Sequence, residues 1–197
     1  MPVNQPTCWI ETIEPEEAGP QLDKIYQKLK AANNKIHNLY IAASLQPKPI
    51  LSSDQYYRDI LLNESNHLDH WFLELLATQV AIAVDCEYAI AHHGENFMTL
   101  LGDDKLANAM IEALRSEDFS DAALFSEKHS ALLAFGAKLT HSPQGMCHDD
   151  IVKLRDAGAS DTEILEAVQT TASFAYWVRY INALGISLGD EKIGMYR

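Results

Sequence analysis

Glu74, Cys86 and His93 are the residues whose types and spacing could support chemistry. A carboxylate paired with an imidazole can pass a proton to or from a substrate, and a cysteine thiolate can cleave a peroxide O–O bond. Three residues after Cys86, where a redox pair would have its second cysteine, the chain has Ala89. The sequence therefore offers an acid–base pair and one thiol, without a neighbouring cysteine to which that thiol could form a disulfide.

These residues fall on two predicted helices, 68–84 and 86–101, joined by a tight turn. If the second helix runs back antiparallel to the first, counting outward from the turn places Glu74 within one helical turn of His93. A carboxylate on an apolar helix face needs a partner, which favours a functional role. We therefore predict a buried Glu74–His93 pair between the two helices, suited to proton transfer.

Ala89 and Cys86 precede His93 on the same face of the second predicted helix. Ala89 lies one turn before His93, so their side chains touch. Cys86 lies two turns before it, roughly 10 Å along the axis at ~1.5 Å per residue, beyond hydrogen-bond reach and nearer the mouth of the site. The backbone dipole at a helix start favours a thiolate, while the neighbouring acidic residues oppose it. A lone cysteine there is also commonly a small buried apolar residue.

The other polar residues near the motif have simpler interpretations. Tyr88 and His92 point elsewhere on the helix, and we interpret them as packing or surface residues, or as support behind the site. His67, His70 and Glu74 have the three- and four-residue steps of metal ligands, but two histidines so close to a helix start fit solvated residues better. We expect neither a metal nor a cofactor.

Apolar residues at three- and four-residue steps predict helices along the whole chain. Pro47 and Pro49 are expected to break the chain before a helix at about 50–63. No strand alternation and no hairpin signal occurs. We predict an all-α, single-domain helical bundle of about eight helices. The predicted helix caps and ends are, in chain order, Asp85, Gly102, Ser126, Gly158 and the capping box of Ser160 with Glu163.

Charge and cysteine content narrow the function classes. The 197 residues carry a formal net charge of −13 with a pI near 4.9, so nucleic acid and anionic membranes are poor partners. No apolar run is long enough to span a bilayer, and the acidic beginning is unlike a signal peptide. Three widely spaced cysteines, Cys8, Cys86 and Cys147, do not form a secreted disulfide framework. We expect a cytoplasmic protein with reduced thiols.

The spacing of Glu74, Cys86, position 89 and His93 resembles the alkyl hydroperoxidase D motif, E–x11–C–x2–C–x3–H, of the carboxymuconolactone decarboxylase superfamily. The resemblance extends along nearly the whole chain. Its further landmarks, which look like those of the peroxidase-related branch, are GPQLDKIYQKL, LLAFGAKLTHSP, IVKLRDAGASDTEILEAV and VRYINALG.

This resemblance implies a helical protomer that assembles into a homo-oligomer, such as a dimer, trimer or hexamer. We expect residues 67–197 to form the alkyl hydroperoxidase D-like core and residues 1–66 an N-terminal helical extension packed on it. In active members the second cysteine attacks the hydroperoxide, a Glu–His relay removes its proton, and the first cysteine resolves the sulfenic acid. Carried over, Glu74 and His93 are the relay and Cys86 is the resolving thiol, but Ala89 replaces the attacking one.

Three functions are consistent with this departure from the motif. The chain could be a one-cysteine peroxidase, in which Cys86 forms a sulfenic acid that an external thiol reductant reduces. It could instead use Glu74 and His93 for non-redox acid–base chemistry on a small organic acid or lactone. It could also be a non-catalytic family member that keeps the fold. A costly buried Glu–His pair argues against the last of these.

Overall fold

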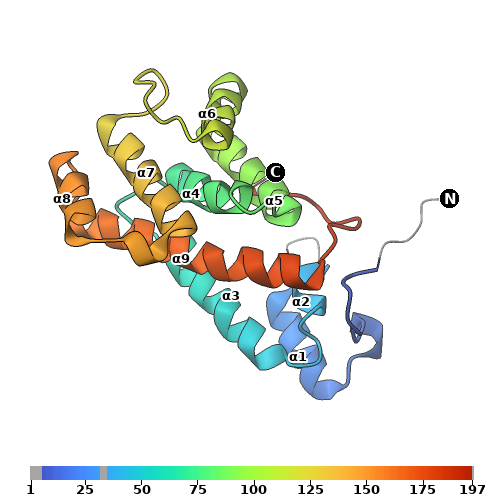
Figure 1. The fold of residues 1–197 in the computed structure, drawn as a ribbon. Helices are drawn as coiled ribbons and strands as arrows, with labels where there is room; N and C mark the ends of the chain where they lie inside the picture. Colours follow the sequence, from blue (N-terminus) through green and yellow to red (C-terminus); the bar gives the residue numbers. More distant parts are fainter. Residues whose placement is uncertain (1–5, 32–34, 197) are drawn as a thin grey trace. The chain divides into compact units, whose positions relative to one another are not determined.

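The computed structural model describes residues 6–31 and 35–196, and within these ranges every regular element is a helix (Figure 1). The predicted all-α class is confirmed. No helix in the described part of the chain combines the length and apolar character needed to cross a bilayer. In chain order the elements are η1 (Pro15–Glu17), α1 (Pro20–Leu29), α2 (Asn38–Ile41), α3 (Pro47–Leu61), α4 (His70–Ile82), α5 (Glu87–Leu101), α6 (Asp104–Ser116), α7 (Glu127–His141), η2 (Pro143–Gly145), α8 (His148–Asp156) and α9 (Asp161–Leu184).

Most of the predicted helix ends are confirmed by their local geometry. The Ser126 hydroxyl accepts a hydrogen bond from the His129 N–H at 3.2 Å, and so caps α7. Ser160 and Glu163 form the reciprocal capping box before α9. Gly102 and Gly158 have the expected left-handed backbone, with φ of 70° and 89°. These side chains and glycines fix where the helices start and stop.

Two predicted helix starts are wrong. Cys86, not Asp85, is the N-cap residue of α5, and Asp85 has a φ of 50°. A left-handed residue is needed there to reverse the chain from α4 into α5, and aspartate tolerates that conformation. The next helix upstream, α3, begins at Pro47 instead of after Pro49. Proline suits the first turn of a helix because the N–H that it lacks would have no partner inside the helix.

The described residues divide into two compact units. The first unit comprises those up to Asp59 together with Arg179–Lys192, and the second comprises Ile60–Val178 together with those from Ile193 onward. The predicted division placed one boundary after residue 66 and assigned the whole C-terminal part to the core. Residues 179–192 belong to the first unit, where Gly185 and Ser187 lie beside Trp9 and Thr7 of the N-terminal part.

In the first unit, the end of α9 and the residues after it pair with residues 7–9. The Trp9 N–H donates to the Leu184 carbonyl at 2.8 Å, and the Ser187 N–H donates to the Thr7 carbonyl at 3.1 Å. A Cβ on Gly185, whose φ is +57°, would overlap the Trp9 ring, with its nearest atom 2.0 Å away. Glycine is therefore required where the indole covers the backbone.

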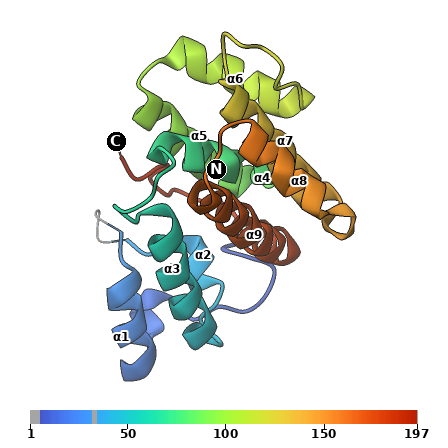
Figure 2. The ribbon, with the colours of Figure 1, turned by 90° about the vertical axis from the view of Figure 1, so that its left-hand side faces the viewer.

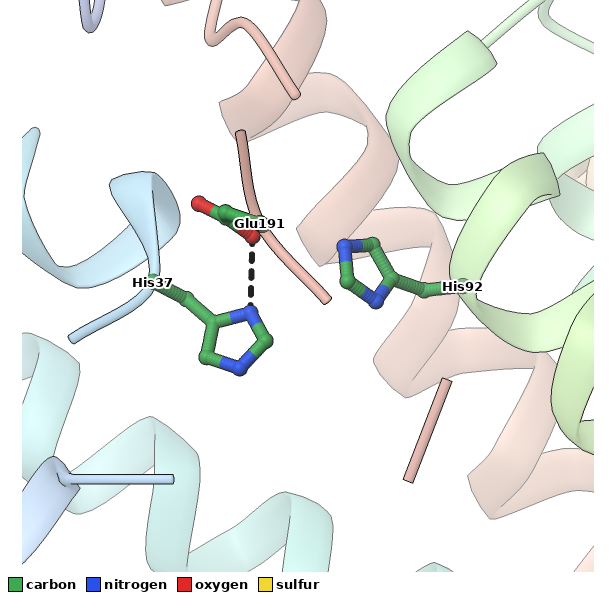
Figure 3. A group of neighbouring side chains, drawn as sticks. All are labelled: His37, His92 and Glu191. Atoms are coloured by element: carbon green, nitrogen blue, oxygen red, sulfur yellow. Dashed lines mark hydrogen bonds and ion pairs between the residues drawn. The ribbon is translucent and has the colours of Figure 1, made fainter. Parts of the chain in front are cut away.

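Glu191 makes a second connection of this kind within the first unit. One of its carboxylate oxygens lies 2.7 Å from His37 Nδ1, as Figure 3 shows, and the other accepts from the Asn38 N–H. The carboxylate thus satisfies a donor in the first turn of α2, which a helix cannot satisfy internally. Around α1 and α2, a small core forms from Leu22, Tyr26, Ile36 and Ile41 with Ile13, Ala18 and Tyr40 packed against it.

In the second unit, α4 is the central helix. All its residues from Phe72 to Ala81 are buried, which explains why the sequence shows apolar residues on every side of it. It packs against α5, α6 and α7, and α8 lies alongside α7 (Figures 1 and 2). Three of the buried residues of α4 are polar: Glu74, Thr78 and Gln79. Because water does not reach them, the protein itself has to provide their partners.

Candidate active site

Glu74 is the most buried charged residue of the site, with 0% of its surface exposed. Its Oε2 lies 2.7 Å from His93 Nδ1, and its Oε1 accepts from Asn96 Nδ2 at 3.1 Å. His93 and Asn96 are three residues apart on α5 and share one face of that helix. The predicted pairing of Glu74 with His93 between α4 and α5 is confirmed, and its catalytic role stays a prediction.

The bond to Glu74 sets the chemistry of the His93 ring. A carboxylate can only accept hydrogen bonds, so Nδ1 carries the proton that it receives. In the neutral ring, Nε2 then has the lone pair and can act as a base. The His93 side chain is 15% exposed whereas that of Glu74 is fully buried, so the imidazole is the member of the pair that solvent reaches.

Phe174 of α9 fixes the plane of the imidazole. Its ring meets the His93 ring edge-on, with centroids 4.5 Å apart and an interplanar angle of 85°. Phe174 is 2% exposed, so this contact belongs to the core of the second unit. Together with Glu74, it holds His93 in one orientation, which proton transfer to a bound substrate requires.

Cys86 is fully buried, so the prediction that it lies near the mouth of the site is wrong. Its N–H donates to the Ala81 carbonyl at 3.0 Å, which draws the start of α5 against the end of α4. Burial raises the pKa of the Cys86 thiol above its ordinary value, and a hydrogen bond with the Ala89 backbone lowers it by less. The raised pKa keeps the thiol protonated at neutral pH.

The positions around the motif are also buried. Ala89 is 2% exposed, so the site of the missing second cysteine lies inside the protein. Tyr88 and His92 are 6% and 7% exposed, and their ring centroids lie 4.8 Å apart. The alternative that they lie on the surface is therefore wrong, and a supporting role behind the site stays a prediction. Cys8 is buried in the first unit, whereas Cys147 is exposed at the start of α8.

The histidines that could have joined Glu74 as metal ligands have separate partners. His67 Nδ1 lies 3.3 Å from a carboxylate oxygen of Glu166, and His70 Nε2 lies 3.1 Å from the Tyr196 hydroxyl. Glu74 is engaged by α5, as described above. The three residues thus bind in different directions instead of converging on one point.

Sequence reasoning missed two parts of the site, Asn96 and the C-terminal segment. Asn96 could have been found, because it lies one helical turn after His93 and therefore on the face that meets Glu74. The segment could not, because no pattern in residues 193–196 indicates that Met195 donates to Asn96 Oδ1 at 2.7 Å.

Comparisons with known proteins agree with this architecture. No protein-family model matches the sequence, and no curated protein matches it significantly. Solved structures do. An uncharacterized peroxidase-related protein from Silicibacter sp. TM1040 has a TM-score of 0.79 at 22% identity, covering 100% of both chains. Another, described as an alkylhydroperoxidase AhpD core, from Ralstonia eutropha JMP134, has a TM-score of 0.78 at 16% identity over 94% of each chain.

A third similar structure has a named activity. It is a cysteine-to-alanine variant of the debrominase Bmp8 in complex with 2,3,4-tribromopyrrole, with a TM-score of 0.70 at 16% identity. The match covers 91% of this chain and 90% of that one. Together these likenesses show that the chain has the alkyl hydroperoxidase D-like fold, as the motif spacing predicted.

Proposed function

We propose that the protein is an alkyl hydroperoxidase-related enzyme in which Glu74 and His93 relay a proton from Cys86, and Cys86 reduces a small hydroperoxide. The observation that carries this proposal is the hydrogen bond between the buried Glu74 carboxylate and His93. The fold shared with peroxidase-related proteins supports it.

The burial of Cys86 makes a relay necessary. Because its pKa is raised, little thiolate forms spontaneously at neutral pH, and a base has to remove the proton. The base in the site is His93 Nε2, held by Glu74 through Nδ1. Cys86 precedes His93 by two turns of helix, roughly 10 Å along the axis, so a water molecule or the hydroperoxide has to bridge the thiol and the imidazole.

The reaction balances with one protein thiol and two external ones. The Cys86 thiolate attacks the distal peroxide oxygen, the O–O bond breaks, and the leaving alkoxide takes the proton back from the imidazolium as an alcohol. Cys86 is left as a sulfenic acid. One external thiol displaces water from it to give a mixed disulfide, and a second releases Cys86 as the thiol together with an external disulfide. Ala89 supplies no sulfur, so the chain cannot resolve the sulfenic acid at that position.

A second candidate function is non-redox acid–base catalysis on a small organic molecule. The observation that favours it is the contrast in exposure within the site, because Cys86 is fully buried while the His93 side chain is 15% exposed. In this case His93 removes a proton from the substrate itself, Glu74 stabilises the resulting imidazolium, and Cys86 only packs the start of α5.

Two pairs of variants separate the candidates. Cys86→Ser and Glu74→Gln are tested for hydroperoxide consumption with dithiothreitol as reductant, and a sulfenic-acid probe is read by mass spectrometry. Their matched controls are Cys147→Ser, at an exposed cysteine, and Glu64→Gln, at an exposed glutamate. The peroxidase proposal expects probe labelling of Cys86 and losses of about a hundredfold or more in both site variants, with the controls unchanged.

The other outcomes contradict the peroxidase proposal or both enzymatic proposals. Labelling of Cys86 no faster than that of free cysteine overturns the peroxidase proposal. Turnover of an organic acid or lactone that survives Cys86→Ser but not Glu74→Gln supports acid–base catalysis instead. If the wild-type protein turns over neither substrate class, both enzymatic proposals fail and the non-catalytic alternative stands.

A further inference from the structure

The end of the chain lies against the two helices that carry the site. Figure 1 shows the segment that follows α9 returning to α5, and the backbone contacts agree. The Gly194 N–H donates to His92 Nδ1 at 3.4 Å, and the Met195 N–H donates to Asn96 Oδ1 at 2.7 Å. Residues 193–196, which we call the C-terminal segment, therefore contact α5 on the same side as the residues that face Glu74.

Asn96 connects this segment to Glu74 through the two ends of one amide. Its Oδ1 accepts from the Met195 N–H at 2.7 Å, and its Nδ2 donates to Glu74 Oε1 at 3.1 Å. A side-chain amide has an oxygen that accepts and an NH₂ group that donates, and these point in different directions. When a backbone N–H binds the oxygen, the NH₂ group has to face the other side. If the amide were reversed, its oxygen would face a carboxylate and its NH₂ would face an N–H. The Met195 backbone therefore aims the Asn96 amide at Glu74.

Gly194 allows the segment to approach closely enough for this contact. Its φ is +76°, and a Cβ there would lie 2.8 Å from Glu95 Cγ and 3.2 Å from Asn96 Oδ1. Any other residue would meet both backbone strain and a steric overlap with α5. The close contact between the C-terminal segment and α5 thus depends on a glycine at this position.

Tyr196 anchors the segment to α4. Its hydroxyl lies 3.1 Å from His70 Nε2, and the two rings meet edge-on with centroids 5.5 Å apart. His70 precedes Glu74 by one helical turn, so the anchor lies on the Glu74 side of α4. Burial, and after it the charge of Glu74, raises the pKa of the Tyr196 hydroxyl, which therefore keeps its proton.

From these contacts we infer that Asn96 is a positioning residue for Glu74, and that the C-terminal segment is a part of the site because it orients the Asn96 amide. This inference rests on the proposed function, since it assigns the segment to the Glu74–His93 relay. Asn96 keeps the Glu74 carboxylate directed at His93, and the segment keeps Asn96 from turning. Neither touches the reacting atoms.

Two variants test this without requiring turnover. Asn96→Asp can still accept from Met195 but cannot donate to Glu74, and it adds a negative charge beside that carboxylate. Gly194→Ala displaces the segment and leaves Asn96 intact. The readout is the His93 ring by nuclear magnetic resonance, namely the Nδ1–H signal, which a carboxylate partner moves downfield, and the pH midpoint of the ring titration.

The controls repeat each chemical change elsewhere in the second unit. Asn108→Asp makes the same substitution at an exposed residue of α6. Gly158→Ala introduces a Cβ at another positive φ, +89°, where nothing lies within 4 Å. Both controls should leave the His93 signals unchanged.

In Asn96→Asp we expect the titration midpoint of the pair to move to higher pH by about one unit or more, because a like charge favours proton uptake. In Gly194→Ala we expect a smaller move in the same direction and a weakened Nδ1–H signal. Wild-type signals in Gly194→Ala would overturn the role of the segment, and wild-type signals in Asn96→Asp would overturn that of Asn96. If the wild-type protein consumes no hydroperoxide, the proposed function fails. The shifts expected in the two variants do not depend on that activity, so the two failures can be told apart.

Discussion

Gln79 of α4 occupies the space beside Gly136 of α7 that a side chain would otherwise fill. Gln79 Nε2 donates to the Leu133 carbonyl at 2.9 Å, and a Cβ on Gly136 would lie 2.8 Å from Gln79 Oε1. The same Cβ would lie 3.4 Å from Leu76 Cδ2. Because Gln79 is held by its bond and is only 3% exposed, it cannot swing away without breaking that bond. The close approach of α4 and α7 therefore depends on a residue without a side chain.

Replacing Gly136 with alanine should destabilise the protein, although the same change inside a helix ordinarily helps. The gain in helix propensity, about 1 kcal/mol, is outweighed by overpacking and the lost Gln79 bond, for a net loss of about 1–2 kcal/mol in the free energy of unfolding. Urea denaturation measures it. Gly94→Ala on α5 is the matched control, since the nearest atom to its Cβ is Thr78 Cγ2 at 4.0 Å, and it should be stabilising. Equal effects from both would contradict this account.

Glu163 should make stability depend on pH. Burial raises the pKa of its carboxyl, but hydrogen bonds from Lys128 and Ser160 lower it by more. The resulting pKa in the folded protein is about 2. The folded pKa lies below the ordinary value of about 4.3, so the stabilisation is present above that value and is lost as the pH falls toward 2. Glu163→Gln should therefore cost about 1–3 kcal/mol near pH 7 and almost nothing near pH 2.

The measurement is a series of thermal or urea unfolding curves of both proteins between pH 2 and pH 7. Glu64→Gln, at an exposed glutamate, serves as the control and should run parallel to the wild type throughout. A difference for Glu163→Gln that stays constant over the whole range would show that packing, and not ionisation, explains the effect.

The three cysteines should react with alkylating reagents in the order of their exposure. Cys147 is exposed, whereas Cys8 and Cys86 are 4% and 0% exposed. Iodoacetamide at pH 8 should modify Cys147 first, and Cys86 at least about a hundredfold more slowly, because alkylation of a buried thiol requires local opening. The raised pKa of Cys86 acts in the same direction by reducing its thiolate fraction. Peptide mapping by mass spectrometry gives the rates of alkylation. Fast alkylation of Cys86 by iodoacetamide would contradict its burial.

Local signals in the sequence were sufficient for much of the fold and for the centre of the site. Ser126 and the Ser160–Glu163 pair mark helix starts through side-chain hydrogen bonds that span only three residues. The Glu74–His93 contact could be predicted because both residues lie on helices joined by one tight turn, where counting along each helix gives their relative height.

Contacts between irregular segments could not be predicted in this way. The pairing of Glu191 with His37 and that of Met195 with Asn96 join positions about a hundred residues or more apart, and neither segment has a periodic pattern. The burial of Cys86 was missed for a related reason, because spacing gives the order of residues along a helix but not what covers it. Such features follow from tertiary packing alone.

The return of the chain end to both units has a consequence for how the protein is made. Residues 179–192 pair with the N-terminal part, and residues 193–196 complete the surroundings of Glu74. During synthesis, domains generally fold from the N-terminus as they emerge from the ribosome. Here each unit includes residues that follow Val178, so neither unit is complete before residues 179–196 have been synthesised.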